Sequence, residues 1–491
     1  MFRLFRSLFR LNQNNLRVTI KNCLFRPFHC AVDMSIPDAS TLGRELIWSA
    51  RRGSIDRVLV LLQNGADVNV KDADGNTALY SACLGIHLDV VRVLLKQDEL
   101  DVNAKNIDGD TALIRASYCG QSAVVQELLK HDKIDVNAKN NDGNTALHCA
   151  CLWRRLDVIG MLLQHEKLDV NGTNEDGNTA LIRASYWELD VANCLLEHDK
   201  VDVNIKNRFG DTALFVACTN GNSLVVRELL KHKVEDVNAL CCRGYTVLTT
   251  ASAHGRLDVV RELLLDDKVD VNRKASNGYT SLILACKNGR FDIVNVLLND
   301  VRVDVNARDD NGGTVLHWAC LRDQVNTVRD LLQHDMVDVN VKDNHGDTAL
   351  IVACFNNNLT LVRELLKYDK LDVNAEDGKR RSAYFWASYK GHWNIVLEFL
   401  KHEKINVNCN GSHGNTALIW ATLHNNLNAV RDLLKHDRVD VNAKNCAGST
   451  ALDIARNCEL FEVTSCLEEH VKLCLSRENS ELKRDGRIAV Q

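Results

Sequence analysis

Apolar residues recur along most of the chain with spacings that predict pairs of short helices. Within residues 109–142, Leu113 and Ala116 lie three positions apart, and Val124 and Leu128 lie four positions apart. Spacings of three and four place side chains on one face of an α-helix, so each group predicts a helix with one buried face. The glycine between the two groups favours a break there. The stretch therefore predicts two short helices joined by a turn.

This two-helix pattern returns at a nearly constant interval, which a Gly-x-Thr triplet marks. The triplet occurs eleven times, and all but two of its intervals are 34 residues. Arg380 stands where a further glycine is expected, and Ser382 stands in place of its threonine. A fixed period of this length means that each unit buries its apolar face against its neighbours, so we expect an elongated solenoid. The glycines are Gly75, Gly109, Gly143, Gly177, Gly210, Gly244, Gly278, Gly312, Gly346, Gly414 and Gly448.

The polar residues of the unit predict how the helices begin and how the units are connected. The threonine of each triplet, such as Thr111, can accept a hydrogen bond from a backbone N–H in the first helical turn. After the second helix come a polar turn, an Asp-Val-Asn triplet and a tip of Asn, Asp and Gly, which suits a hairpin bend. We therefore expect a projecting hairpin in each unit.

Together these features resemble the ankyrin repeat. Gly-x-Thr-Ala-Leu, an Ala-Cys or Ala-Ser pair, Val-Val-x-x-Leu-Leu and Asp-Val-Asn carry the resemblance, which extends from about residue 41 to about residue 470. It implies an all-α solenoid of about 13 helix-turn-helix units with projecting β-hairpin loops, elongated and curved around a concave face. The chain then divides into an N-terminal extension at 1–40, the ankyrin repeat array at 41–470 and a polar C-terminal tail at 471–491.

Composition narrows the classes of function. With 45% hydrophobic and 25% charged residues, the chain has ordinary values for a soluble protein. A net charge of -5 gives no basic footprint for a phosphate backbone, so we expect no nucleic-acid ligand. The sequence contains no run of about 18 apolar residues, so we expect no membrane span.

The first 33 residues differ in kind from the repeats and leave two interpretations open. Arg3, Arg6 and Arg10 recur at helical spacing among phenylalanines, and no acidic residue occurs before Asp33. That composition is typical of a mitochondrial transit segment. Alternatively, the segment is an untranslated or non-functional extension, because Met34 directly precedes a normal start to the array. We expect a cytoplasmic protein, with a mitochondrial location as the alternative.

The 18 cysteines do not predict a disulfide or a zinc site. Six of them follow an alanine at one repeat position where other units carry serine or threonine, which indicates a need for a small side chain. No Cys-x-x-Cys occurs, so a structural zinc site lacks sequence support. Free thiols indicate a reducing compartment. The six are Cys83, Cys151, Cys218, Cys286, Cys320 and Cys354.

The sequence predicts no catalytic residue, no cofactor and no metal site. His148 and Cys151 lie three residues apart and form a conceivable nucleophile pair. Each fills a position of the repeat, however, so we expect both to be structural. We therefore expect a protein that is not an enzyme.

Residues that vary between units mark the expected binding surface. The resemblance implies that the ends of the first helices and the hairpin tips line the concave side. Aromatic residues end these helices in three consecutive units, with Phe355 and Tyr389 further on. Aromatic side chains beside a polar rim are typical of interface hot spots. Alternatively, these aromatic side chains pack against neighbouring units and fill the core. The candidate site comprises Tyr118, Trp153, Tyr186 and Trp187 with the tip residues Asp74, Asp108, Asp110, Asp142 and Asp176.

The acidic tips also predict the chemistry of the partner. Carboxylates at the tips of consecutive units attract a basic segment of a protein. The aromatic side chains beside them would supply desolvated contact. Trp318, Trp386 and Trp420 lie one helical step before the helix ends, and we expect these three in the core.

The Asp-Val-Asn asparagines have two interpretations. An asparagine in a turn bonds to nearby backbone and holds the loop. The ankyrin resemblance also implies that some match the context modified by asparaginyl hydroxylase. The modification candidates are Asn137, Asn204, Asn306 and Asn442.

From the sequence we therefore expect a monomeric, non-catalytic scaffold or adaptor that binds a partner protein through the concave groove and the hairpin tips. One alternative is a client-targeting subunit of a modifying complex. Another alternative is a mitochondrial ankyrin-repeat protein. Whether the protein is mitochondrial depends on whether residues 1–33 act as a transit segment.

Overall fold

The computed structural model describes the backbone of residues 39–186, 189–411 and 413–484. The chain falls into two compact units, Met1–Ile107 and Asp108–Gln491. The segment at 1–33 and the predicted site residue Trp187 lie outside the described residues.

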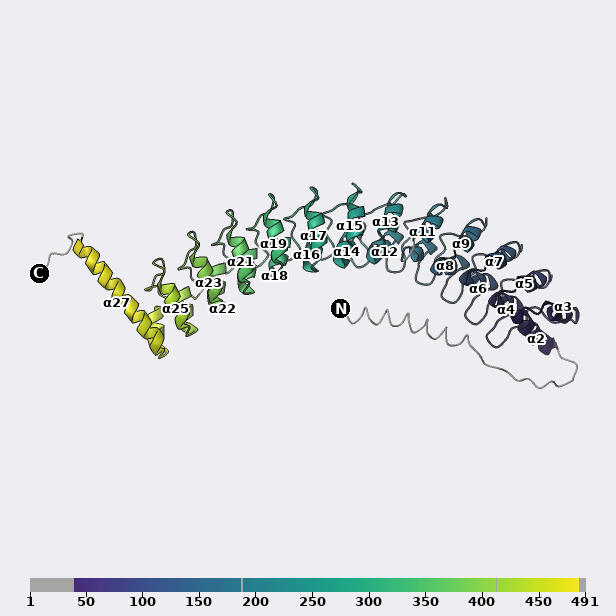
Figure 1. Ribbon diagram of the computed structural model, residues 1–491, viewed down its shortest axis with the longest axis horizontal. Coiled ribbons are helices and arrows are strands. Elements are labelled where there is room, and N and C mark those ends of the chain that lie inside the picture. The colour runs from purple at the N-terminus through teal and green to yellow at the C-terminus, as the bar shows by residue number, and fades with distance from the viewer. Residues whose placement is uncertain (1–38, 187–188, 412, 485–491) are drawn as a thin grey trace. The chain divides into compact units, whose positions relative to one another are not determined.

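The first unit contains two helix pairs in its described part. The helices are α2 (Ala39–Arg52), α3 (Ile55–Gln63), α4 (Ala78–Gly85) and α5 (Leu88–Leu94) (Figure 1). Helix α2 packs on α3 and on α4, and α4 packs on α5. Leu46 and Leu61 are buried between these helices, as the apolar spacing of the sequence requires.

In the second unit the helices continue in pairs from α6 to α27 (Figure 1). The first helix of each pair packs on the first helix of the next, as α6 does on α8, and the second helices pack likewise, as α7 does on α9. The all-helical fold of paired repeat units is thereby confirmed. The pairs are α6 (Ala112–Cys119) and α7 (Ser122–Leu129), α8 (Ala146–Leu152) and α9 (Leu156–Leu163), α10 (Ala180–Ala184) and α11 (Leu189–Leu196), α12 (Ala213–Asn220) and α13 (Ser223–Leu230), α14 (Val247–His254) and α15 (Leu257–Leu264), α16 (Ser281–Lys287) and α17 (Phe291–Leu298), α18 (Val315–Leu321) and α19 (Val325–Leu332), α20 (Ala349–Phe355) and α21 (Leu359–Leu366), α22 (Ala383–Lys390) and α23 (Trp393–Leu400), α24 (Ala417–Leu423) and α25 (Leu427–Leu434), and α26 (Ala451–Asn457) and α27 (Phe461–Arg484).

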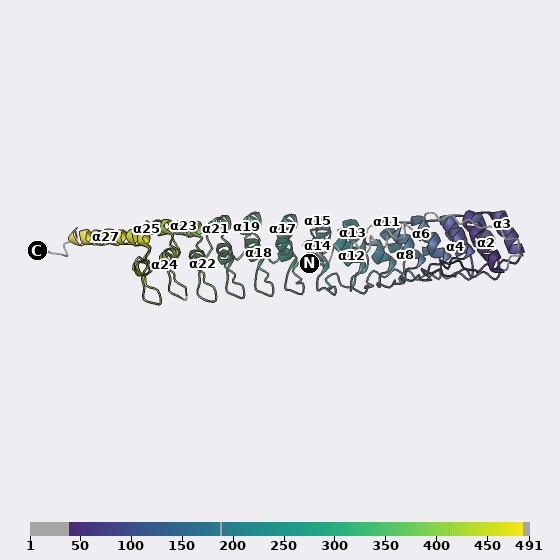
Figure 2. The same ribbon diagram turned by 90° about the horizontal axis from the view of Figure 1, so that it is seen from below.

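The loops that precede the first helices are turns rather than β-ladders. From α12 to α24 they extend to one side of the row of helices (Figure 2). Within the described ranges they form no strand, and a single isolated bridge joins Glu376 and Ser382. The expected hairpins are therefore tight turns, which are closed by backbone hydrogen bonds, such as that from the Asn140 N–H to the Asn144 carbonyl at 3.0 Å, together with side-chain bonds.

The loop between α7 and α8 shows how these turns are held. The side-chain oxygen of Asn140 accepts hydrogen bonds from the N–H groups of Asp142 at 3.1 Å and Asn144 at 2.9 Å. Gly143 has a φ of +75°, and a Cβ atom there would lie 2.5 Å from the backbone nitrogen of Glu175 in the next loop. Only glycine combines the left-handed conformation with this close approach.

The first helices begin as the sequence predicts. Thr111 Oγ1 accepts a hydrogen bond from the N–H of Ile114 at 3.3 Å and caps α6. At α22 the cap is Ser382, whose hydroxyl accepts from the N–H of Phe385 at 3.2 Å. The serine therefore keeps the cap in the unit that lacks the threonine.

The same unit keeps the turn without its glycine. Arg380 adopts a φ of +59°, in the same left-handed region as the glycines of the Gly-x-Thr triplets, whose φ values lie between +72° and +83°. The Asp377 carboxylate accepts from the N–H groups of Lys379 at 2.8 Å and Arg381 at 3.0 Å, as Asn140 does in its own loop. A non-glycine residue pays about 1–2 kcal/mol for this conformation, and the neighbouring hydrogen bonds hold it in place.

The repeated Ala-Cys position lies in the core. Cys83, Cys218 and Cys354 are completely buried, and burial raises the pKa of the Cys286 thiol to about 12. Thiols in such surroundings are small apolar groups rather than nucleophiles. At the far end of the chain, α27 continues as a helix through Arg484, past the predicted start of the polar tail at 471.

Candidate protein-binding faces

The first aromatic cluster lies at the ends of α6, α8 and α10, and we call Tyr118, Trp153 and Tyr186 the early face. The rings of Tyr118 and Trp153 lie 4.7 Å apart between centroids, at an interplanar angle of 55°. The Arg115 guanidinium lies 5.2 Å from the Tyr118 ring centroid, and that of Arg183 lies 6.0 Å from the Tyr186 centroid. All three side chains are half-buried, and the Tyr118–Trp153 contact joins two neighbouring units.

Trp153 has no polar anchor in the described part of the chain. Its indole N–H is buried and makes no hydrogen bond to a described residue. An unpaired buried donor costs about 1–3 kcal/mol. Packing against Tyr118 therefore holds this ring in place.

The acidic tips of the second unit accompany this face. Asp108, Asp142 and Asp176 are exposed, and their backbone carbonyls accept hydrogen bonds at 2.9–3.0 Å from the next tip. In the first unit, Asp74 is exposed as well. Asp110 differs, because burial raises its pKa and Asn140 donates to its carboxylate at 2.9 Å. The structure thus places Asp110 between two loops and the other four at exposed tips.

A second aromatic cluster lies on α20, α22 and α24, and we call Phe355, Trp386, Tyr389 and Trp420 the late face. Ring centroids lie 5.0 Å apart for Phe355 and Trp386, 5.8 Å for Trp386 and Tyr389, and 4.9 Å for Tyr389 and Trp420. Phe355 and Tyr389 are each 43% exposed. The late face is therefore a continuous set of ring contacts across three units.

The three tryptophans expected in the core are only partly buried. Trp386 and Trp420 belong to the late face, whereas Trp318 on α18 packs on Tyr279 with ring centroids 5.7 Å apart. Trp318, Trp386 and Trp420 are half-buried rather than buried. Trp386 and Tyr389 lie three residues apart on α22, so both project from the same side of the helix. The same spacing in the sequence was the signal that could have identified them.

Cations lie against the rings of the late face. The Arg381 guanidinium is 4.2 Å from the Trp386 ring centroid, and the Lys390 ammonium is 4.2 Å from that of Phe355. Asp377 anchors this arrangement by accepting from Arg381 Nε at 2.7 Å and from the Trp386 indole N–H at 3.3 Å. Cation–π contacts of this kind contribute about 0.5–1 kcal/mol each at exposed sites.

The late face also borders a hollow of about 210 Å³. Leu321, Ile351, Val352, Phe355 and Trp386 supply apolar walls, and Asp347 lies at one side. Burial raises the pKa of the Asp347 carboxyl. The volume suits one or two side chains, because whole small-molecule sites occupy about 300–1,000 Å³.

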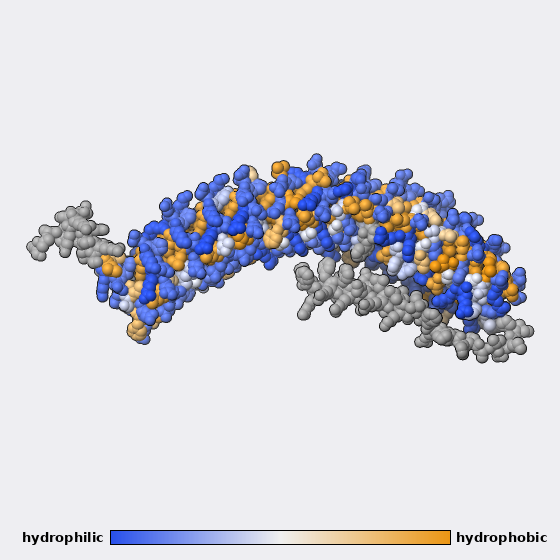
Figure 3. Space-filling view, viewed as in Figure 1, coloured by the Kyte–Doolittle hydropathy of each residue, from blue (hydrophilic) through white to orange (hydrophobic). Residues whose placement is uncertain are grey.

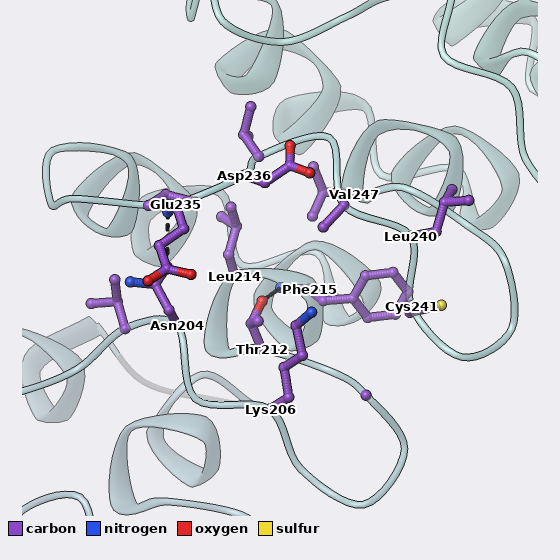
Figure 4. A pocket seen from close by; sticks show the side chains of 15 residues that line it. Asn204, Lys206, Thr212, Leu214, Phe215, Glu235, Asp236, Leu240, Cys241 and Val247 are labelled. Carbon is purple, nitrogen blue, oxygen red and sulfur yellow. Dashed lines mark hydrogen bonds between the residues drawn. The ribbon is translucent and has the colours of Figure 1, made fainter.

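A smaller cavity of about 70 Å³ lies beside α12 (Figure 4). Leu214 and Phe215 line it together with Val234 and Glu235. At the repeat position where Ile134 is buried, this unit carries the exposed Glu235. A charged side chain leaves that apolar space unfilled, since burying it unpaired is costly. The cavity is therefore a packing defect.

The predicted asparagines hold adjoining units together. Asn137 donates from its amide to a backbone carbonyl of the next unit at 2.7 Å and accepts from a backbone N–H there at 2.8 Å. Asn204 and Asn306 form the same pair of bonds in their units. Asn442 donates its backbone N–H to Asp440 at 2.9 Å in its own turn. Hydroxylation of these residues stays a prediction.

His148 and Cys151 do not form a nucleophile pair. The two ring nitrogens of His148 lie 2.9 Å from Thr145 Oγ1 and 2.9 Å from the carbonyl oxygen of Asn178. Burial lowers the pKa of His148 to about 4 and raises that of the Cys151 thiol. The histidine is thus a cap of α8 that also joins two units.

The described residues show neither a metal site nor a membrane-spanning helix. They contain no cluster of three or more His, Cys, Asp or Glu side chains that could hold a metal ion. None of the described helices is long and apolar enough to cross a bilayer. In the view of Figure 3, hydrophobic residues lie in patches between hydrophilic ones along the repeats.

Comparison with known proteins gives the same picture over most of the chain. A family model described as ankyrin repeats (3 copies) matches residues 46–140, 133–207, 188–275, 282–377 and 370–445. A probable E3 ubiquitin-protein ligase of Oryza sativa subsp. japonica is 46% identical over 54 residues, which cover 11% of this chain and 10% of that protein. Protein fem-1 homolog C of Homo sapiens is 36% identical over 72 residues, or 15% of this chain and 11% of that protein. Osteoclast-stimulating factor 1 of Monopterus albus is 41% identical over 59 residues, or 12% of this chain and 28% of that protein. The chain thus matches a small part of each relative.

Proposed function

Because the chain belongs to the ankyrin-repeat family, whose repeats mediate contacts between proteins, we propose that it is a non-catalytic scaffold for a partner protein. The partner carries a basic segment and binds at the early face. The scaffold acts as a monomer in the cytoplasm. The observation that carries the proposal is the Tyr118–Trp153 ring contact beside exposed acidic tips.

The chemistry of the early face favours such a partner. The carboxylates of Asp108, Asp142 and Asp176 recur once per unit, and they attract cations during encounter. Tyr118 and Trp153 are half-buried, so a partner can desolvate the apolar surface that remains in contact with water. Charge therefore steers the segment, and the rings hold it.

Binding of a short fluorescein-labelled peptide rich in lysine, arginine and leucine tests the proposal. We expect Trp153→Ala to weaken binding by about 2 kcal/mol, roughly thirtyfold in Kd, as at interface hot spots. Tyr389→Ala is the matched control on the late face, and it should leave this Kd unchanged. If the folded Trp153 variant binds the peptide as tightly as the wild type, the early face is not the site. Circular dichroism reports whether the variants remain folded.

A client-targeting role is the second candidate. Its support is the match to a probable E3 ubiquitin-protein ligase, although the shared region is 10% of that protein. A targeting subunit would co-purify with a ubiquitin-conjugating complex in stoichiometric amounts. Absence of such a complex from the purified full-length protein would contradict this role.

A mitochondrial location is the alternative to the cytoplasm. It rests on the arginine and phenylalanine spacing of residues 1–33. Fluorescent fusions of the full chain and of a chain starting at Met34 distinguish the two. A mitochondrial signal that is lost on truncation supports the transit segment, and identical cytoplasmic signals contradict it.

A further inference from the structure

We propose that the late face is a second, separate interaction surface, and that it binds an acidic segment of a partner protein that carries a large apolar side chain. The apolar side chain enters the hollow that Leu321, Val352 and Phe355 line, and the acidic side chains pair with Arg381 and Lys390. The ligand expected here is acidic, whereas the partner proposed for the early face is basic, so neither proposal depends on the other.

The positive charge of the late face is the first observation that favours an acidic partner. Arg381 and Lys390 both lie 4.2 Å from ring centroids, so their cationic heads are held at the surface. Lys390 is exposed, and no carboxylate of the described chain forms an ion pair with it. A carboxylate of a partner would thus find an ammonium group that is held in place and has no competing anion.

Asp377 does not cancel this charge for a partner. Its side chain is completely buried, and it already accepts hydrogen bonds from Arg381, from two backbone N–H groups and from the Trp386 indole. Arg381 keeps 25% of its side chain exposed, so part of the guanidinium fork can reach a second carboxylate. Asp377 therefore positions Arg381 rather than attracting a cationic ligand.

The ring geometry argues against a cationic ligand as well. The rings of Trp386, Tyr389 and Trp420 touch edge to face at 75–78°, which leaves no open cage between them. Faces of Trp386 and Phe355 are already covered by the protein's own cations. A second cation there would meet like charge and an occupied ring face.

The hollow supplies the apolar half of the recognition. Its volume of about 210 Å³ and its walls of Leu321, Ile351 and Val352 suit a leucine or phenylalanine side chain. Leu321 is 51% exposed and Phe355 is 43% exposed, so covering them removes apolar surface from water. Asp347 lies on one side of the hollow, so we expect the acidic side chains of the segment to bind away from it, at Arg381 and Lys390.

A selection from a displayed library of random peptides on the full 491-residue chain tests this inference. We expect one enriched class rich in Asp and Glu with a leucine or an aromatic residue. Resynthesised peptides of this class, followed by fluorescence anisotropy, should lose about tenfold or more in affinity for Lys390→Glu and for Phe355→Ala. Lys268→Glu makes the same charge change in the turn after α15, and Trp153→Ala removes a ring of the early face. Both should leave the affinity within about twofold.

Several results would overturn the inference. These are selection of no acidic class, retention of affinity in both late-face variants, or an equal loss with Lys268→Glu. Lys390→Gln, which keeps an uncharged polar side chain, guards against a folding artefact and should give an intermediate loss. If the basic peptide does not bind at the early face, the result for the acidic peptides at the late face still stands, because the two tests use different peptides and different variants.

Discussion

The early face combines the Tyr118–Trp153 contact with exposed carboxylates at the tips, and its own cations, Arg115 and Arg183, lie 5.2 and 6.0 Å from ring centroids. In the late face, Arg381 and Lys390 both lie 4.2 Å from ring centroids. Both faces are built on the first helices of consecutive units and on the loops before them. Their backbones follow the same repeat. The difference shows that the repeat determines caps and core, and leaves the outward positions of the first helix and the tip free to vary in charge.

The two faces also differ in how their tryptophans are anchored. The Trp386 indole donates to Asp377, whose carboxylate occupies the loop position that Asn140 fills in the early region. Trp153 lacks such an acceptor among the described residues. The two tryptophans occupy different repeat positions, since Trp386 follows Arg380 by six residues and Trp153 follows Gly143 by ten. In the late region the Asp377 carboxylate holds the turn, Trp386 and Arg381 together. Trp386 should consequently be the more rigid ring.

The largest expected effect concerns the early tip, which depends on glycine. Gly143→Ala would force a left-handed conformation on alanine and place its Cβ 2.5 Å from Glu175 N. We expect a loss of about 4 kcal/mol in the free energy of unfolding, from strain of about 1–2 kcal/mol plus the backbone clash. Gly448→Ala, where no atom lies within 4 Å, is the control and should lose only the strain term. Equal losses in urea denaturation would show that close approach between loops does not matter.

Much of this architecture could be predicted from the sequence. The Gly-x-Thr period predicts the cap at Thr111 and the tight turn at Gly143, because each depends on a few adjacent residues. The late face depends on contacts between units, such as that of Phe355 with Trp386, and on the cation above each ring. Spacing along one helix predicts the side from which Trp386 projects, but not which neighbour covers it.

The cavity beside α12 could be predicted from the sequence only in part. Glu235 at a position that is apolar in neighbouring units was visible in the sequence, but the vacant space depends on how far Val234 can reach. The Arg380 turn is similar. The missing glycine was evident, whereas the compensating bonds to Asp377 required the structure.

A second prediction uses two buried histidine caps, His148 on α8 beside the early face and His317 on α18. Burial lowers both pKa values, that of His148 to about 4 from 6.5. Below pH 6.5 the unfolded chain binds a proton that folded His148 does not, so stability falls as the pH drops from about 6.5 to about 4 and is unaffected above that range. We expect about 3 kcal/mol of pH dependence from His148, at about 1.4 kcal/mol per pH unit.

His148→Ile isolates that contribution, because isoleucine occupies the same repeat position at Ile114 and Ile182. Urea denaturation at pH 7 and pH 5 should show a smaller stability difference in the variant than in the wild type. His317→Ile tests the second cap in the same way. Unchanged pH dependence in both variants would mean that each histidine has the same pKa in the folded and the unfolded protein.

A smaller effect distinguishes the late tip from the early one. Arg380 holds a left-handed conformation beside two further cations, so we expect a local stability minimum at residues 376–390, seen as fast amide exchange. Arg380→Gly should stabilise this region by about 0.5–1 kcal/mol, since the strain relieved exceeds the chain entropy that glycine adds. Exchange as slow as in the flanking units, with no gain in the variant, would contradict the strain argument.

The smallest expected effect concerns the exposed tips and is kinetic. Changing Asp108, Asp142 and Asp176 together to asparagine removes the charges that steer a basic peptide, while Tyr118 and Trp153 still hold it once bound. We expect slower association, by several-fold at low salt, a weaker dependence of that rate on ionic strength and nearly unchanged dissociation, measured by stopped-flow fluorescence. Lys379→Gln should likewise slow the association of acidic peptides with the late face. If the aspartate changes instead speed dissociation at constant association rate, the carboxylates contact the bound peptide directly, and the division between steering tips and binding rings does not hold.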